Sequence, residues 1–85
     1  MATIEPSTTP NPDAMKFSLD VTLPGMIDAK SPGDAPDSAF VADVLAVEGV
    51  AAVFGVNDFV TVTRMSGADW EPIIEAVRSA AAVHL

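Results

Sequence analysis

Proline placement decides where this 85-residue chain can form helices. Six of its seven prolines fall within the first 36 residues, and three of those lie in the short stretch 5–12. Each proline fixes its own φ and disfavours the helical conformation of the residue before it. The sequence therefore predicts a Pro-rich turn at 5–13, with at most a short strand at Ile4, and it confines the helices to the later part of the chain.

Three segments of the chain are predicted to form strands. In 15–19 the odd positions are apolar and would face a core, whereas the even positions would face outward. Two further apolar segments, 50–56 and 59–64, are rich in β-branched residues and are separated by Asn57-Asp58. Because this dipeptide favours a tight turn, the two segments are expected to pair as a hairpin.

Two segments carry apolar residues at the three- and four-residue spacing of an amphipathic helix. The first is expected at 39–47, with Ser38 as its N-cap and Gly49 in the left-handed position that ends it. The second is expected at 70–83, with Asp69 as its N-cap.

The resulting order of elements is strand, strand, helix, strand, strand, helix. The economical arrangement is a two-layer ββαββα domain of the α+β class, in which two helices pack on one face of a largely antiparallel four-stranded sheet. We expect this single domain to cover residues 1–85. The segment 20–37 contains three prolines and is expected to be a long loop, with a few extended residues at 21–23 or 26–29.

The charge balance limits the expected partners. Twelve acidic residues against four basic ones give a formal net charge of −8. Phosphates and anionic lipids would be repelled, so we expect neither nucleic acid nor membrane as a partner. The first residues lack the features of a secretory signal, and no apolar run approaches the roughly 18–20 residues that span a bilayer. We therefore expect a soluble, cytoplasmic and monomeric protein.

No pattern of residues indicates catalysis. The chain has no cysteine, which excludes thiolate nucleophiles and the usual ligands of an iron–sulfur cluster. Its one histidine, His84, lies next to the C-terminus and is expected to be solvated. Asp28, Asp34 and Asp37 could gather around a hard cation, but they lack the ligand spacing of a calcium loop. We expect no catalytic site, no metal site and no cofactor in this chain. A protein that binds a metal ion through these carboxylates is the least favoured of three functional hypotheses, and the other two are given below.

Several motifs are more specific than packing requires. In chain order they are Thr9-Pro10-Asn11-Pro12-Asp13-Ala14-Met15-Lys16-Phe17, Val47-Glu48-Gly49-Val50, Val53-Phe54, Asp58-Phe59-Val60-Thr61-Val62-Thr63-Arg64 and Asp69-Trp70. In this order, and over nearly the whole chain, they resemble the N-terminal domain of the Nfu/NifU family of iron–sulfur scaffold proteins.

The resemblance implies a non-catalytic accessory domain, because in that family a separate module with a Cys-x-x-Cys pair holds the cluster. The implied partners are proteins of iron–sulfur cluster assembly or such a Cys-x-x-Cys module, and any cluster would be held there. The alternative is a standalone interaction or regulatory domain of the same fold with no iron–sulfur role. The matched motif residues expected to be structural are Pro10, Asn11, Pro12, Phe17, Gly49, Asp69 and Trp70.

Alternation also predicts an interaction surface. Two helices can cover only one face of a sheet, so the other face is open to water or to a partner. The residues assigned to this open face are Lys16, Ser18, Phe59, Thr61 and Thr63. An aromatic ring between polar residues, with a cation nearby on an acidic protein, is a candidate docking surface. A merely solvated face is the alternative.

Overall fold

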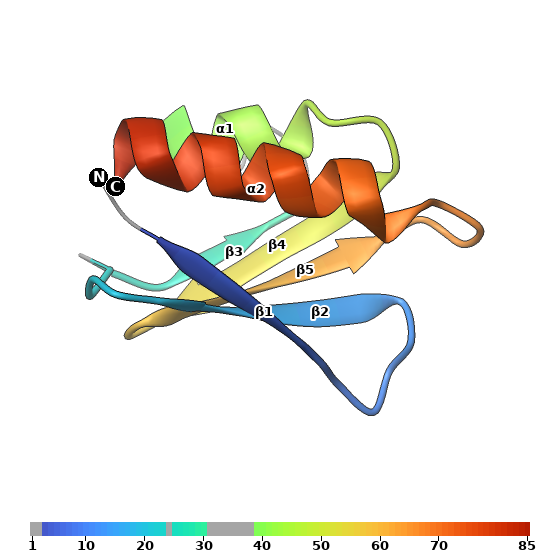
Figure 1. Cartoon of the computed structure of the whole chain (residues 1–85), viewed down its shortest axis with the longest axis horizontal. Helices are drawn as coiled ribbons and strands as arrows, with labels where there is room; N and C mark the ends of the chain where they lie inside the picture. The colour runs from blue at the N-terminus through green and yellow to red at the C-terminus, as the bar shows by residue number, and fades with distance from the viewer. Residues whose placement is uncertain (1–2, 24, 31–38) are drawn as a thin grey trace.

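The computed structural model describes residues 3–23, 25–30 and 39–85, which form two layers (Figure 1). One layer is an antiparallel sheet with the strand order β1-β2-β5-β4-β3. Its strands are β1 (Ile4–Thr8), β2 (Ala14–Leu19), β3 (Ile27–Ala29), β4 (Val50–Val56) and β5 (Phe59–Arg64).

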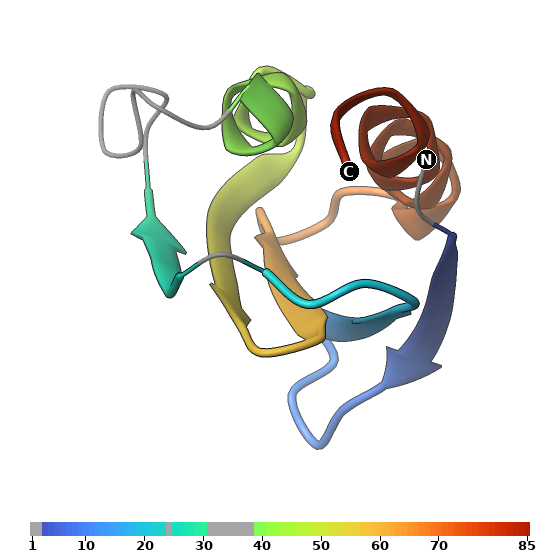
Figure 2. The same ribbon diagram turned by 90° about the vertical axis from the view of Figure 1, so that its left-hand side faces the viewer.

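The second layer consists of α1 (Ala39–Leu45) and α2 (Trp70–His84), which lie side by side on one face of the sheet. Helix α1 lies over β4, and α2 lies on the side of β1 (Figure 2). The expected two-layer α+β arrangement is thus confirmed. The expected strand number is wrong, because the sheet has five strands and not four.

Edge strand β1 is longer than the short strand expected at Ile4, and it occupies part of the segment predicted as a Pro-rich turn. Residues 4–8 pair with β2, and Pro6 lies opposite Phe17. Proline is tolerated at the edge of a sheet, where a missing N–H need not break the ladder on both sides. The turn is therefore shorter than predicted and runs from Thr9 to Asp13 between the two strands.

The other edge strand, β3, lies inside the segment predicted as a long loop. It pairs with β4, and Ile27 lies opposite Gly55, which confirms the second of the two extended segments expected there. The first, 21–23, forms no strand, although the Leu23 side chain is buried. The predicted N-cap Ser38 lies outside the described residues.

The central hairpin follows the sequence prediction, whereas the helix ends differ from it by one or two residues. Strands β4 and β5 have the predicted bounds, and Asn57 in the turn between them has a φ of 56°. Gly49 has the left-handed φ of 97° that was expected, but it lies four residues beyond the end of α1, so the prediction that it ends the helix is wrong. Its conformation belongs to the turn at 47–50, in which the Val50 N–H donates to the Val47 carbonyl oxygen at 3.2 Å. Helix α1 ends two residues earlier than predicted, at Leu45, and α2 ends one residue later, at His84.

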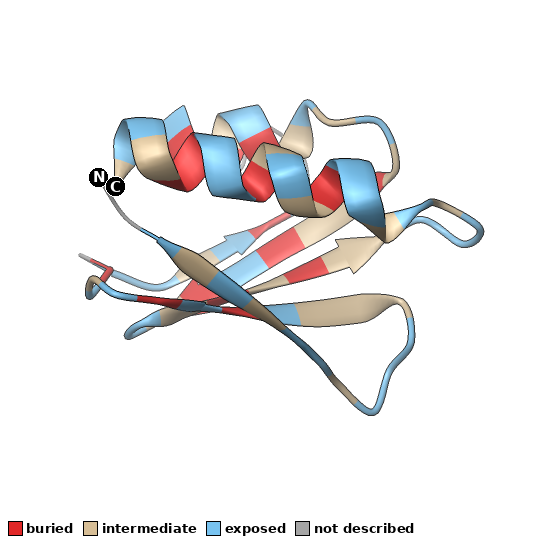
Figure 3. Ribbon diagram, in the orientation of Figure 1, coloured by how far each residue is buried: buried red, intermediate tan, exposed pale blue. Residues whose placement is uncertain are grey.

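The hydrophobic core lies between the sheet and the helices (Figure 3). It is built from alternate residues of the strands and from the inner stripes of the two helices. Its largest fully buried side chains are Phe17, Phe40, Ile73, Val41, Val44, Val53, Val60, Val62 and Val77. No polar residue is buried in the part of the chain that the structure describes, so packing of apolar side chains holds the two layers together.

His84 at the end of α2 is exposed, as expected, but it also has a partner that the sequence did not indicate. The Nε2 atom of His84 lies 2.6 Å from Oδ2 of Asp43 in α1, so this pair joins the two helices. No helix among the described residues is long and apolar enough to cross a membrane.

Candidate functional site

The face of the sheet opposite the helices carries the residues predicted to dock a partner. In the register of β2 and β5, Lys16 lies opposite Thr61 and Ser18 lies opposite Phe59. Residues paired in this way point to the same face of a sheet. Phe17 and its partner Val60 are fully buried beneath the helices, so the residues on either side of them point to the open face. Thr63, the fifth predicted residue, also belongs to this open face.

Lys16 and Phe59 are in contact on the open face. The Lys16 Nζ atom lies 4.6 Å from the centroid of the Phe59 ring. The two residues are diagonal neighbours across β2 and β5, a spacing that a lysine side chain can span. Such a cation–π contact contributes about 0.5–1 kcal/mol at an exposed site. It holds an ammonium group and an aromatic ring together as one surface feature.

Phe54 is a member of the open face that the sequence did not place there. It lies opposite Thr61, and Asp28 of β3 lies opposite Phe54. Its side chain is 39% exposed, which is high for a large apolar residue. Strand β4 is almost continuously apolar and carries a register irregularity between Val50 and Ala52, so alternation gives no clear face. Counting back from the hairpin turn would have placed Phe54 opposite Thr61.

The charges on this face are arranged from edge to centre. Glu5 of β1 lies opposite Ser18, and Asp28 occupies the opposite edge strand. Lys16 lies between them in β2. The open face therefore has carboxylates at both edges and an aromatic–lysine pair toward the middle.

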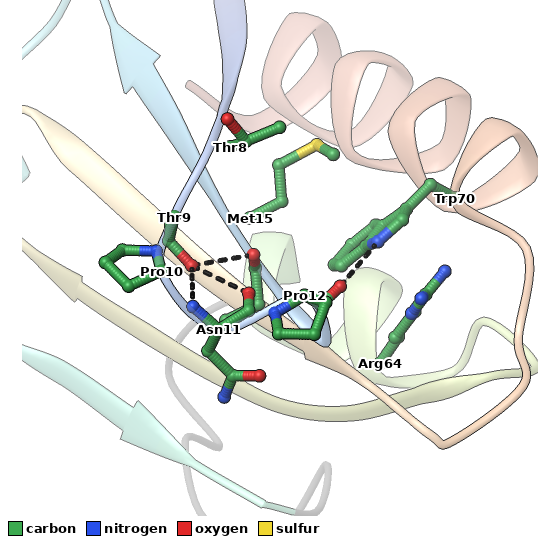
Figure 4. Close-up of a pocket in the computed structure, with 9 residues that line it drawn as sticks. Thr8, Thr9, Pro10, Asn11, Pro12, Met15, Arg64 and Trp70 are labelled. Carbon is green, nitrogen blue, oxygen red and sulfur yellow. Dashed lines mark hydrogen bonds between the residues drawn. The ribbon is translucent and has the colours of Figure 1, made fainter.

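The proline motif forms a second distinctive feature, the turn between β1 and β2 (Figure 4). The Thr9 hydroxyl lies 2.9 Å and 3.0 Å from the carbonyl oxygens of Asn11 and Ala14, and it accepts the Asn11 backbone N–H at 3.2 Å. The Asn11 Oδ1 atom accepts the Asp13 backbone N–H at 3.0 Å. The motif side chains thus close the turn themselves, as local hydrogen bonds of Asn and Thr do.

Arg64 and Trp70 connect this turn to the start of α2. Arg64 donates from Nε to Oδ1 of Asp13 at 3.2 Å and from Nη1 to the carbonyl oxygen of Ala68 at 2.8 Å. Its guanidinium carbon lies 5.3 Å from the centroid of the Trp70 ring. The Trp70 indole N–H donates to the carbonyl oxygen of Pro12 at 3.3 Å. Three motifs that are far apart in sequence therefore meet at one place.

A pocket of about 320 Å³ opens where these motifs meet (Figure 4). Its lining residues are Thr8, Thr9, Pro10, Asn11, Pro12, Ala14, Met15, Arg64 and Trp70. Trp70 was expected to be a core or helix-entry anchor, and it packs against the core. It is only partly buried, however, and it also forms a wall of the pocket.

Asp69 occupies the predicted N-cap position of α2 but does not form the expected capping hydrogen bond. Asp69 precedes the helix with φ −83° and ψ 138°, as an N-cap residue does, yet its side chain makes no capping hydrogen bond. The prediction that Asp69 caps α2 through its side chain is therefore wrong.

We searched the described residues for groups of side chains that could bind a metal ion. Residues 3–23, 25–30 and 39–85 contain no group of three or more His, Asp or Glu side chains that could hold a metal ion. Of the three aspartates considered as cation ligands, Asp34 and Asp37 lie outside the described residues.

The fold and these two surfaces define a small α+β domain with an open sheet face and a pocket beside a tied proline turn. The sequence matches the family described as "Scaffold protein Nfu/NifU N terminal" over residues 4–85. The chain belongs to this family, which confirms the resemblance inferred from the motifs.

Known relatives cover nearly the whole chain. An uncharacterized protein of Bacillus subtilis, YpgR, is 38% identical over 82 residues, which are 91% of this chain and 20% of that protein. The mitochondrial "NFU1 iron-sulfur cluster scaffold homolog" of Drosophila erecta is 40% identical over 73 residues, 82% of this chain and 26% of that protein. The chain thus spans between a fifth and about a quarter of the length of these relatives.

A crystal structure of Staphylococcus aureus protein SAV1430 is similar in fold, with a TM-score of 0.76 and 35% sequence identity. The match covers 92% of this chain and 96% of that one.

Proposed function

We propose that this domain is a non-catalytic accessory domain that docks onto proteins of iron–sulfur cluster assembly and does not itself hold a cluster. Membership of the Nfu/NifU N-terminal family supports this role, as does the similarity to the iron-sulfur cluster scaffold homolog of Drosophila erecta. The absence of cysteine supports the proposal that the domain does not itself hold a cluster, because thiolates are the usual ligands of such clusters.

The Lys16–Phe59 contact on the open face is the observation that carries the docking proposal. Aromatic residues contribute strongly to protein interfaces when they lie near the centre of a contact surface. Phe59 and Phe54 provide two such rings on neighbouring strands, and Thr61 lies opposite Phe54. The residues proposed to carry docking are Lys16, Ser18, Phe59, Thr61 and Thr63, together with Phe54.

Charge indicates which kind of partner surface fits. The chain has a net charge of −8, and carboxylates occupy both edges of the open face, at Glu5 and Asp28. Electrostatic complementarity steers association toward surfaces of opposite sign. The fitting partner therefore presents an apolar patch flanked by basic residues, with one acidic group to face Lys16.

Affinity capture from native lysate, followed by measurement of the dissociation constant for the captured partner, tests this proposal. The double substitution Lys16→Glu with Phe59→Ser should weaken binding at least tenfold, or about 1.4 kcal/mol. A matched control is Arg78→Glu with Val83→Ser on α2, which makes the same charge change and removes one exposed apolar side chain. The control should bind as the unchanged protein does.

The outcomes separate the two functional hypotheses. Unchanged affinity in a double variant whose amide spectrum shows a folded protein would move the docking site away from this face. Capture of proteins unrelated to iron–sulfur assembly, lost in the double variant, would instead support the alternative of an interaction or regulatory domain with no iron–sulfur role.

A further inference from the structure

The pocket beside Trp70 is separate from the open face. It is lined by Thr8 and Met15, which lie opposite each other on β1 and β2, and by the first residue of α2. Its volume of about 320 Å³ lies at the lower end of the range for small-molecule sites. A pocket of this size accommodates a short peptide segment with one or two side chains rather than a large cofactor.

The walls of the pocket are mostly apolar and are held in place. Pro10, Pro12, Met15 and Trp70 supply apolar surface (Figure 4). The turn that contains both prolines is fixed by the bonds of Thr9 and Asn11 and by the attachment of Asp13 to Arg64. A wall fixed before binding lowers the entropic cost of holding a ligand.

Two hydrogen-bond donors of the pocket are available to a ligand. Thr9 Oγ1, Asn11 Oδ1 and the Pro12 carbonyl already accept hydrogen bonds within the domain. Within the described residues, the Thr8 hydroxyl and the Nη2 group of Arg64 make no hydrogen bond. A complementary ligand therefore offers acceptors to these donors, such as backbone carbonyls.

Charge disfavours an anionic ligand. The cation among the lining residues, Arg64, is already paired with Asp13 at 3.2 Å, and the chain as a whole is strongly acidic. Neutral carbonyl acceptors flanked by positive charges match this setting better than a carboxylate or a phosphate does.

We infer that this pocket binds an extended proline-containing segment of a partner protein, flanked by lysine or arginine. Proline has no N–H to leave unpaired, and polyproline segments dock into aromatic-lined grooves at low conformational cost. The Trp70 indole N–H already donates to the carbonyl oxygen of Pro12, so a proline-containing segment of this chain lies beside the ring. The ligand's prolines would lie against Trp70, Met15 and Pro10, and Thr8 would donate to a ligand carbonyl.

A synthetic peptide with a Pro-Pro-Leu-Pro core and two arginines on each side tests the inference. Trp70 is the only tryptophan of the chain, so its indole N–H signal and its fluorescence report on this pocket alone. We expect saturable shifts of the indole signal and of the Thr8 and Met15 amides. A control peptide of equal charge, with alanine in place of each proline, should bind at least about fivefold more weakly.

Variants locate the binding. Thr8→Val keeps the side-chain shape at an exposed strand end and removes the donor, and it should weaken binding at least about threefold without unfolding the domain. Lys16→Glu with Phe59→Ser should bind the peptide unchanged. Absence of saturable shifts, equal binding of the alanine peptide, or shifts centred on Lys16 and Phe59 would each overturn the inference. Loss of peptide binding at the pocket leaves the partner assay of the open face unaffected, so the failure of one proposal is distinguishable from the failure of the other.

Discussion

The indole N–H of Trp70 donates a hydrogen bond to the carbonyl oxygen of Pro12, 58 residues earlier in the chain. Pro12 lies in the turn between β1 and β2, whereas Trp70 opens α2. Together with the Arg64–Asp13 pair, this bond ties the first hairpin to the helical layer. The proline motif and the Asp-Trp motif are thus in direct contact through a hydrogen bond.

Substitution of Trp70 should destabilise the domain less than loss of a fully buried aromatic. Because the ring is partly exposed, Trp70→Ala should cost about 2–3 kcal/mol, below the range for complete burial. Ile73→Ala, at a fully buried position, should cost about 3–4 kcal/mol. Trp70→Phe keeps most of the ring and should lose only about 1 kcal/mol for the bond to Pro12. Urea unfolding measures all three, and an unchanged midpoint for Trp70→Ala would contradict a stabilising role.

Two glycines with positive φ separate backbone strain from crowding. Gly49 has a φ of 97°, and a Cβ there would lie 2.9 Å from Cβ of Ala68. Gly67 has a φ of 85°, but a Cβ would meet nothing within 4 Å. Gly67→Ala should therefore cost about 1 kcal/mol for strain alone, and Gly49→Ala should cost at least about 1 kcal/mol more. Equal losses in thermal or urea melts would show that the contact with Ala68 relaxes freely.

Removal of the Asp69 side chain should have only a small effect, because it makes no capping hydrogen bond. Asp69→Ala should cost about 0.3–0.5 kcal/mol, the value of an exposed charge near a helix N-terminus. Asp69→Asn should cost the same, since it also removes the charge. If the alanine variant loses about 1 kcal/mol or more while the asparagine variant retains stability, a side-chain cap forms in solution.

Asp20 should titrate at a lower pH than a free aspartate. The backbone N–H of Thr3 donates to its carboxylate at 3.0 Å and lowers the pKa of Asp20 below its ordinary value. Because the folded pKa is below the unfolded one, the contribution to stability is present above the unfolded pKa and is lost as the pH falls through the folded pKa. Carboxyl NMR titration measures this midpoint. Thr3→Pro removes the donor and should raise the midpoint, and identical midpoints would show that this bond does not form.

The isolated chain should not retain an iron–sulfur cluster. It has no cysteine and one histidine, which cannot supply the ligands of a usual cluster. Anaerobic reconstitution followed by desalting should leave a colourless protein. A stable chromophore with stoichiometric iron and sulfide on the monomer would contradict the accessory role proposed here.

The sequence by itself determined the features that depend on local geometry. The period of β2 and β5 separated Lys16 and Phe59 from the core side of the sheet, because successive strand residues alternate between faces. The Asn57-Asp58 turn set the ends of β4 and β5. Gly49 marked the left-handed turn that precedes β4, since glycine adopts a positive φ most easily. The order of the motifs along the chain was sufficient to identify the family.

Only the tertiary structure decided which segments pair with distant neighbours. Strand β1 forms despite its proline, and β3 forms from three residues, because each adds to the edge of a sheet that other strands hold. The conformational preferences of a short segment do not indicate which distant strands it will pair with. For the same reason the sequence did not predict the face of Phe54, which is set by its pairing with Thr61. It also did not predict the pocket, which forms only because α2 brings Trp70 to Pro12. Contacts between residues far apart in the chain depend on the assembled layers and not on the periodicity of any one segment.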